Sequence, residues 1–125
     1  MAAVIVVTDL ASPGAIGRGG LAVYELQWVH GLERLGHRVL VVEFLHRDPG
    51  DPGRKTAARY FGKCMGLRRQ PELSALFVES PLECLHGLAA GVVARYAGSA
   101  AALVTLAARY RRDPYPWWPK SGRGS

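Results

Sequence analysis

The sequence predicts an α/β domain in which a short parallel sheet lies between flanking helices, in three layers. Two continuous apolar runs, residues 4–7 and 39–42, have the composition of strands that are buried on both faces. A glycine-rich segment and an apolar pattern of helical period separate these runs. Strand, loop, helix and strand in this order form a βαβ unit, whose two strands are expected to be parallel and adjacent.

The length and composition fit one folded domain. The chain has 125 residues, of which 49% are hydrophobic and 21% charged, a balance that excludes intrinsic disorder. Residues 113–125 hold three prolines, two adjacent tryptophans and a Gly/Ser-rich end. We therefore expect a domain over residues 1–112, followed by a tail over residues 113–125.

The first elements follow from changes in the apolar period. After the strand at 4–7, residues 12–20 contain too many glycines to sustain regular structure. A helix is expected from Leu21, because one helical face collects Leu21, Tyr24, Trp28, Leu32 and Leu35. Gly36 then stands where a helix C-cap glycine is expected, and the second strand follows at 39–42 and ends at residues 43–45.

The second half of the chain is predicted to continue with helices and one strand. Residues 54–69 are expected to form a helix and residues 73–78 a strand. Ser80, Pro81 and Glu83 resemble a helix start, with Ser at the N-cap and Pro at the first position, which predicts a helix from 81 to about 96. Gly98 and Ser99 should interrupt it, and residues 100–111 are predicted to form a further helix or its continuation.

The net charge of +6 comes mainly from the part of the chain after residue 53. Such asymmetry is compatible with a nucleic-acid or anionic-membrane partner. The basic residues, however, stand as singles and pairs, such as Arg68-Arg69 and Arg111-Arg112, and they form no aromatic-interleaved RNA-binding signature of the RRM type. We therefore predict a solvated basic face and disfavour nucleic-acid binding.

The two cysteines, Cys64 and Cys84, stand twenty residues apart in apolar surroundings. Neither belongs to a Cys-x-x-Cys pair, and four ligands cannot be assembled at a spacing typical of zinc sites. Both are predicted to be small core residues rather than metal ligands.

The sequence predicts a cytoplasmic protein. The N-terminus lacks a basic segment, and Asp9 cuts its apolar run short, unlike a signal peptide. The longest uncharged stretch near the C-terminal end, residues 96–108, is thirteen residues long and too short to span a bilayer. Association with a membrane surface remains compatible with these features.

The segment between the first strand and the first helix is the candidate site. Gly17, Arg18, Gly19 and Gly20 would let the backbone approach a ligand closely, and the unpaired N–H groups of the following helix favour an anion such as phosphate. Arg18 could add a charge-assisted contact. The spacing is neither the dinucleotide fingerprint nor a Walker A loop, although Glu43 stands where dinucleotide-binding folds carry a ribose-binding acid. The alternative is a turn that only joins strand to helix.

Two short stretches resemble the opening of GT-B glycosyltransferases, over about residues 4–45. These are Arg18-Gly19-Gly20-Leu21-Ala22 and the later Leu35-Gly36-His37-Arg38-Val39. Glycogen and starch synthases have a similar Lys-x-Gly-Gly-Leu loop, whose lysine and glycines contact the donor phosphates. In this chain the arginine directly precedes the glycine pair. The resemblance implies a Rossmann-like domain of the acceptor-side, N-terminal type.

The resemblance also implies an activity and its partners. A complete enzyme of this class transfers a sugar from a nucleotide-sugar donor to an acceptor hydroxyl, with no metal or other cofactor required by the fold. The activated sugar is held mostly by a second, C-terminal domain, which 125 residues cannot also contain. The chain is therefore expected to be a partial or truncated glycosyltransferase, with a nucleotide-sugar or acceptor molecule as ligand and a second glycosyltransferase domain as partner.

No catalytic residue is assigned from the sequence. His30, His37 and His86 are expected to be surface or structural histidines, and Asp9 is expected to bond loop N–H groups. Two alternatives to the glycosyltransferase hypothesis stay open. One is a non-catalytic interaction module that uses the basic second half and Trp117 and Trp118 as a contact surface, and the other is a small nucleotide-binding Rossmann protein.

Overall fold

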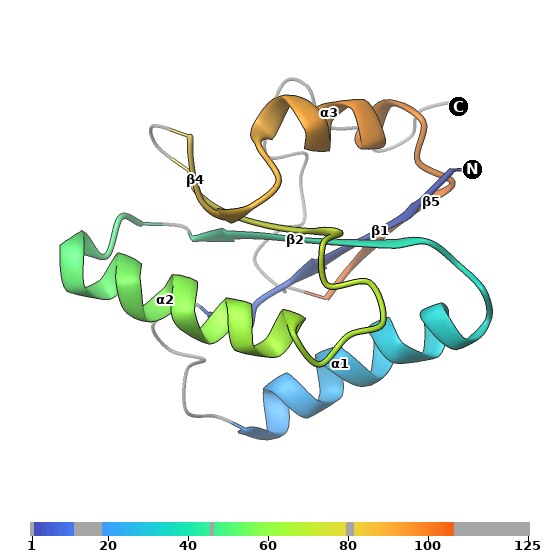
Figure 1. Ribbon diagram of the computed structural model, residues 1–125, viewed down its shortest axis with the longest axis horizontal. Helices are drawn as coiled ribbons and strands as arrows, with labels where there is room; N and C mark the ends of the chain where they lie inside the picture. The colour runs from blue at the N-terminus through green and yellow to red at the C-terminus, as the bar shows by residue number, and fades with distance from the viewer. Residues whose placement is uncertain (1, 12–18, 46, 80–81, 107–125) are drawn as a thin grey trace.

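The computed structural model describes residues 2–11, 19–45, 47–79 and 82–106 (Figure 1). Strands and helices alternate along most of these residues, as expected for an α/β domain. Their bounds are β1 (Val4–Thr8), α1 (Gly19–Arg34), β2 (Val39–Leu45), α2 (Gly50–Met65), β3 (Ser74–Val78), β4 (Glu83–Gly87), α3 (Ala90–Gly98) and β5 (Ala102–Thr105).

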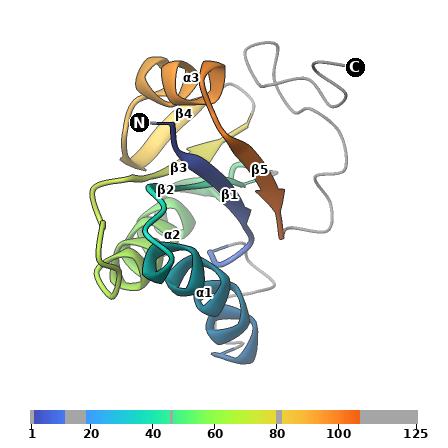
Figure 2. The same ribbon diagram turned by 90° about the vertical axis from the view of Figure 1, so that its right-hand side faces the viewer.

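The strands form one sheet in the order β4-β3-β2-β1-β5. β5, β1, β2 and β3 pair in parallel, and β4 adds an antiparallel edge beside β3. Helices α1 and α2 cover one face of the sheet and α3 covers the other, which gives three layers (Figures 1 and 2). The predicted three-layer α/β, Rossmann-like fold class is confirmed.

The predicted βαβ unit is confirmed by the pairing of the two strands. β1 and β2 run in parallel, from the pair Val4 and Val39 to the pair Thr8 and Glu43. All residues of both strands are buried, which explains why their apolar runs are continuous rather than alternating. Alternate side chains of β1 point to opposite faces: Val6 belongs to the core cluster beneath α1 and α2, and Ile5 to the cluster beneath α3.

The end of α1 is built as the sequence predicts. Gly36 has a φ of +90°, a left-handed conformation that glycine adopts without a Cβ penalty. Its N–H donates to the Glu33 carbonyl at 3.0 Å, and the His37 N–H donates to the Leu32 carbonyl at 3.1 Å. These two bonds form a Schellman motif, which ends the helix and turns the chain toward β2.

The helix predicted over 81–96 is wrong in its first part, where the chain forms β4. The helix-start signal at Ser80 and Pro81 falls outside the described residues. Gly87 helps to explain why this segment forms a strand despite the helix-start signal. Its φ is +86°, and a Cβ added to it would lie 2.1 Å from the Ser74 carbonyl oxygen. This close approach lets β4 pair with β3, and helix α3 then ends at Gly98, as predicted.

The helix predicted over 100–111 is also wrong, since residues 102–105 form β5. A run of four apolar or β-branched residues is compatible with either structure, and pairing with β1 decides in favour of a strand. Residues 107–111 of this prediction, the predicted boundary at 112 and the tail at 113–125 lie outside the described residues. The other elements are confirmed, with α1 starting two residues and α2 four residues earlier than predicted.

The buried face of α1 differs from the predicted apolar face. Tyr24, Trp28 and Leu35 are exposed, although they fall on the predicted face. The helix buries Val29 between two glutamates, Glu25 and Glu33, and these three side chains are at most 5% exposed. The two glutamates can be buried because each has a polar partner. Glu25 accepts a hydrogen bond from a backbone N–H at the end of β1, and Glu33 forms an ion pair with an arginine.

That arginine, Arg68, corrects the prediction of an entirely solvated basic face. Its side chain is fully buried, and its Nη2 donates to Glu33 Oε2 at 3.2 Å and to the Val39 carbonyl at 2.6 Å. Nη1 donates to the Leu73 carbonyl at 2.8 Å. Arg68 therefore connects the chain after α2 with α1 and with the amino ends of two strands.

The two cysteines have different environments. Cys64 is buried on α2, as predicted for a small core residue, whereas Cys84 on β4 is exposed, contrary to the prediction. Burial raises the pKa of the Cys64 thiol, and partial desolvation of the sulfur raises the pKa of the Cys84 thiol although the residue as a whole is exposed. Neither thiol is therefore activated as a nucleophile by its surroundings.

The longest helices of the described ranges, α1 and α2, have 16 residues each. None of the helices in those ranges is both long and apolar enough to cross a membrane.

Candidate functional site

The carboxyl end of β1 is the topological switch point of the sheet. The chain passes from β1 to β2 on one side, and it reaches β5 on the other side of β1 only after α3 (Figure 2). In open α/β sheets, ligands bind in the crevice outside such strand ends. The predicted glycine-rich site adjoins this end, because it joins β1 to α1 in the sequence.

The predicted site residues divide into two groups. Gly19 and Gly20 are the first two residues of α1, so the helix begins within the predicted site rather than after it. Gly17 and Arg18 lie outside the described residues. The part of the site that the structure does describe is its floor, which consists of residues 8–11 and two buried glutamates.

Glu43 on β2 is the first of these glutamates. Its carboxyl group is fully buried and accepts three hydrogen bonds: from Thr8 Oγ1 at 2.8 Å, from the Leu10 N–H at 2.6 Å and from the Ala11 N–H at 2.6 Å. The predicted alternative, a ribose-binding acid, would need an accessible carboxylate. The Glu43 carboxylate instead holds the chain that leaves β1.

Glu25 on α1 is the second buried glutamate at the floor of the site. Its Oε1 accepts a hydrogen bond from the Asp9 N–H at 2.9 Å, which ties the second turn of the helix to the strand end. Its Oε2 is buried and finds no hydrogen-bond partner within the described residues. A buried carboxylate oxygen without a hydrogen-bond partner lowers the stability of the fold. Such an atom is often explained by a bound ion, a water molecule or a proton, or by a functional role.

The two glutamates together bind three successive backbone N–H groups, those of Asp9, Leu10 and Ala11. Successive N–H groups after a first strand are the donors that anions use in related folds. Here they are already occupied by the protein's own carboxylates. These three N–H groups are therefore not free to bind an anionic ligand.

Burial raises the pKa of both carboxyl groups to about 7. For Glu43 the hydrogen bonds from Leu10, Ala11 and Thr8 oppose this increase. For Glu25 the hydrogen bond from Asp9 opposes it, and the charges of Glu43 and Asp9 add to it. Both groups thus change protonation near neutral pH, where they could accept or release a proton at the floor of the site.

This titration makes the stability of the fold depend on pH. A carboxyl whose pKa rises from 4.5 to about 7 on folding stabilises the protein fully below pH 4.5, and this contribution is lost as the pH rises through 7. We expect Glu25→Gln to reduce the loss of unfolding free energy between pH 5 and 8 by up to about 3 kcal/mol, measured by urea denaturation. The exposed Glu72→Gln is the control and should leave the loss unchanged. An equal pH dependence in Glu25→Gln and the unmodified protein would contradict the assignment.

The apolar face predicted for the first helix does not include Glu25, and the predicted site does not include Thr8. The sequence does contain a pattern that could indicate burial of Glu25, because the spacing of Ala22, Glu25, Val29 and Glu33 places them on one helical face. This pattern becomes convincing only once the hydrogen-bond partners of the two glutamates are known. Of the predicted structural histidines, His86 packs edge to face on Phe61, with ring centroids 5.8 Å apart. The described residues contain no group of three His, Cys, Asp or Glu side chains placed to hold a metal ion.

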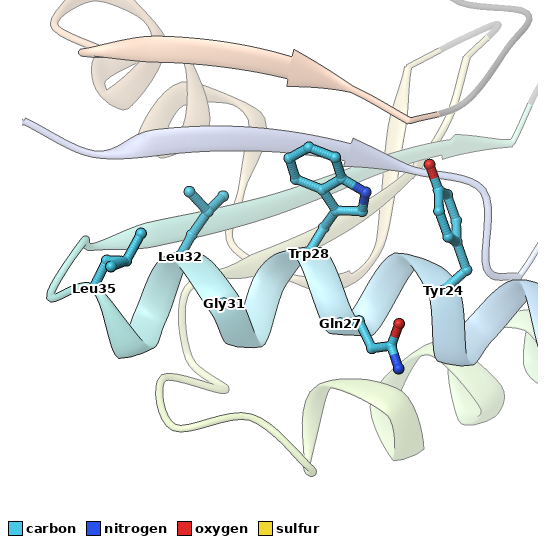
Figure 3. A pocket seen from close by; sticks show the side chains of 6 residues that line it. All are labelled: Tyr24, Gln27, Trp28, Gly31, Leu32 and Leu35. Carbon is cyan, nitrogen blue, oxygen red and sulfur yellow. The ribbon is translucent and has the colours of Figure 1, made fainter.

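A second surface feature lies away from the strand ends, on the flank of α1. It is an open groove of about 340 Å³. Figure 3 shows Tyr24, Trp28 and Leu32 directed from the helix toward β1 and β5, whereas Gln27 points away from the strands. The groove is lined by Tyr24, Gln27, Trp28, Gly31, Leu32 and Leu35. The lining carries no charged side chain, so this groove suits an apolar partner rather than a phosphate.

Comparisons of the chain with protein-family models, with curated proteins and with solved structures found no match.

Proposed function

We propose that this chain is the acceptor-side, N-terminal-type domain of a GT-B glycosyltransferase. In this proposal Gly17, Arg18, Gly19 and Gly20 contact the diphosphate of a nucleotide-sugar. Sugar transfer to an acceptor hydroxyl requires a second domain that holds the donor sugar.

One observation carries the proposal: the segment with the Arg-Gly-Gly motif joins the carboxyl end of β1 to the start of α1 at the switch point of the sheet. The position agrees with ligand binding in open α/β sheets, and the motif agrees with the resemblance described above. The positive end of the α1 dipole adds stabilisation for an anion there. Glu25 and Glu43 occupy the N–H groups of residues 9–11, so in this proposal the phosphate uses donors of the segment that carries the motif.

Binding of nucleotides by the full chain tests the proposal. We expect calorimetry to detect UDP or a UDP-sugar, and Arg18→Ala to weaken that binding by about tenfold or more, because a hydrogen bond to a charged group contributes about 1.5–3 kcal/mol. Arg95→Ala is the matched control, since Arg95 is an exposed arginine on the opposite face of the sheet. It should leave the affinity unchanged.

The same titration separates the alternatives. Binding of NAD in preference to UDP-sugars would favour a nucleotide-binding Rossmann protein of another type. No binding of any nucleotide would contradict the phosphate site and favour the interaction module, for which the apolar flank of α1 is the supporting observation.

A further inference from the structure

The flank of α1 that faces β5 leaves large apolar side chains exposed. Tyr24 is 53%, Trp28 46% and Leu35 77% exposed, and they account for half of the six large hydrophobic side chains exposed in the described ranges. All three line the groove of Figure 3, on the side of α1 away from α2 (Figures 2 and 3). A monomer rarely leaves aromatic side chains gathered in this way without a partner.

The neighbouring strand β5 is an open edge of the sheet. It pairs with β1 on one side, and no described strand pairs with its other side. Its sequence, Ala-Leu-Val-Thr, has no charge and no proline. It therefore lacks the usual features that prevent an edge strand from pairing with another chain.

The opposite edge of the sheet differs in these respects. β4 begins with the exposed Glu83, which pairs with Arg54, and its register with β3 is irregular between Leu76 and Phe77. A charge and an irregular register both discourage pairing with a further strand. Among the residues that the structure describes, the sheet is thus protected at β4 and open at β5.

The groove and the β5 edge lie on the same flank of the described fold (Figures 2 and 3). Val104 of β5 packs against the same core cluster as α1, whereas Leu103 pairs with Ile5 and so faces the α3 side. Pairing with β5 requires a strand edge, and covering the exposed aromatic side chains of α1 requires an apolar surface beside that edge. The occupant must therefore present both a strand edge and an apolar surface.

We propose that this surface binds a second copy of the chain. A two-fold axis beside β5 would pair β5 with its copy in antiparallel fashion and continue the sheet across the interface. The same axis would bring the α1 flanks of both copies to the same face, so that Tyr24 and Trp28 meet their equivalents. The Leu103 side chains would meet on the α3 face. This inference does not depend on the proposed function.

The oligomeric state of the full chain in solution tests this dimer. Sedimentation equilibrium at micromolar concentrations should give a mass twice the 13.5 kDa of one chain. Leu103→Lys on the strand and Trp28→Lys on the helix should each weaken the dimer by about tenfold or more. Leu67→Lys is the matched control, because Leu67 is an exposed leucine after α2, and it should leave the dimer intact.

Hydrogen exchange at β5 provides a second measurement that does not require a variant to fold. Amides on the open side of β5 should become more protected as the protein concentration rises. A chain that stays monomeric throughout, or a dimer that neither substitution weakens, would overturn the proposal. Protection that does not change with concentration in a monomeric chain would also overturn it, because residues 107–125 of the same chain would then be the better candidate for covering the edge.

Discussion

Arg68→Met is expected to lower the free energy of unfolding by about 3–5 kcal/mol. The substitution leaves the carboxylate of Glu33 buried without its partner, and it removes the donors to the Val39 and Leu73 carbonyls. Burial lowers the pKa of Arg68, and the charge of Glu33 opposes this, so the guanidinium depends on its partner. Urea denaturation of the purified variant measures the loss.

Two further variants separate the charge from the packing. Arg69→Met removes the adjacent, exposed arginine and should change the stability by less than about 0.5 kcal/mol. Glu33→Leu combined with Arg68→Met should recover part of the loss, because no unpaired charge then remains, while the two carbonyls still lack a donor. Stability of Arg68→Met equal to that of the unmodified protein would show that this network does not support the fold.

Glu43→Leu is expected to cost about 2–5 kcal/mol, because it removes the acceptor of three buried donors at once. The N–H groups of Leu10 and Ala11 and the hydroxyl of Thr8 would be left without their present partner. Denaturation in urea at neutral pH measures the total effect, and amide exchange at Leu10 and Ala11 measures the local effect.

Thr8→Val serves as the partial variant, since it removes a single hydrogen bond to the same carboxylate. It should cost about 1 kcal/mol and leave the exchange of the Leu10 and Ala11 amides slow. If Glu43→Leu affected these two amides no more than Thr8→Val does, the role of Glu43 in holding the strand end would be contradicted.

The sequence predicts the βαβ unit well because its signals are local. Two fully buried strands need continuous apolar runs, and Gly36 needs no partner beyond its own helix to adopt a left-handed conformation. β4 and β5 are different, because the structure of each short segment is decided by strand pairing: β4 pairs with the strand directly before it, β3, and β5 pairs with β1 at the start of the chain. A helix-start signal at Ser80 and an apolar run at residues 102–105 could not reveal those partners.

The place of the glycine-rich segment between β1 and the first helix could be predicted, but the contacts of the buried glutamates beside it could not. The glycines and the following helix place a loop at the end of β1, whereas the burial of Glu25 and Glu43 follows from contacts between elements. From the sequence alone, a glutamate on a helix or near a strand end is expected to be exposed. Only the tertiary structure shows that backbone N–H groups face Glu25 and Glu43. The same reasoning applies to Arg68, which the sequence shows only as one member of a basic pair.

The buried charges give the interior an electric polarity along the strand direction. Arg68 lies at the amino ends of β2 and β3, and Glu43 lies at the carboxyl end of β2. Above pH 7 the ionised glutamates direct a negative potential toward the switch point, which opposes the positive end of the α1 dipole. Below pH 7 their protonation removes this opposition. We therefore expect any anion held at this strand end to bind more strongly below pH 7 than above it.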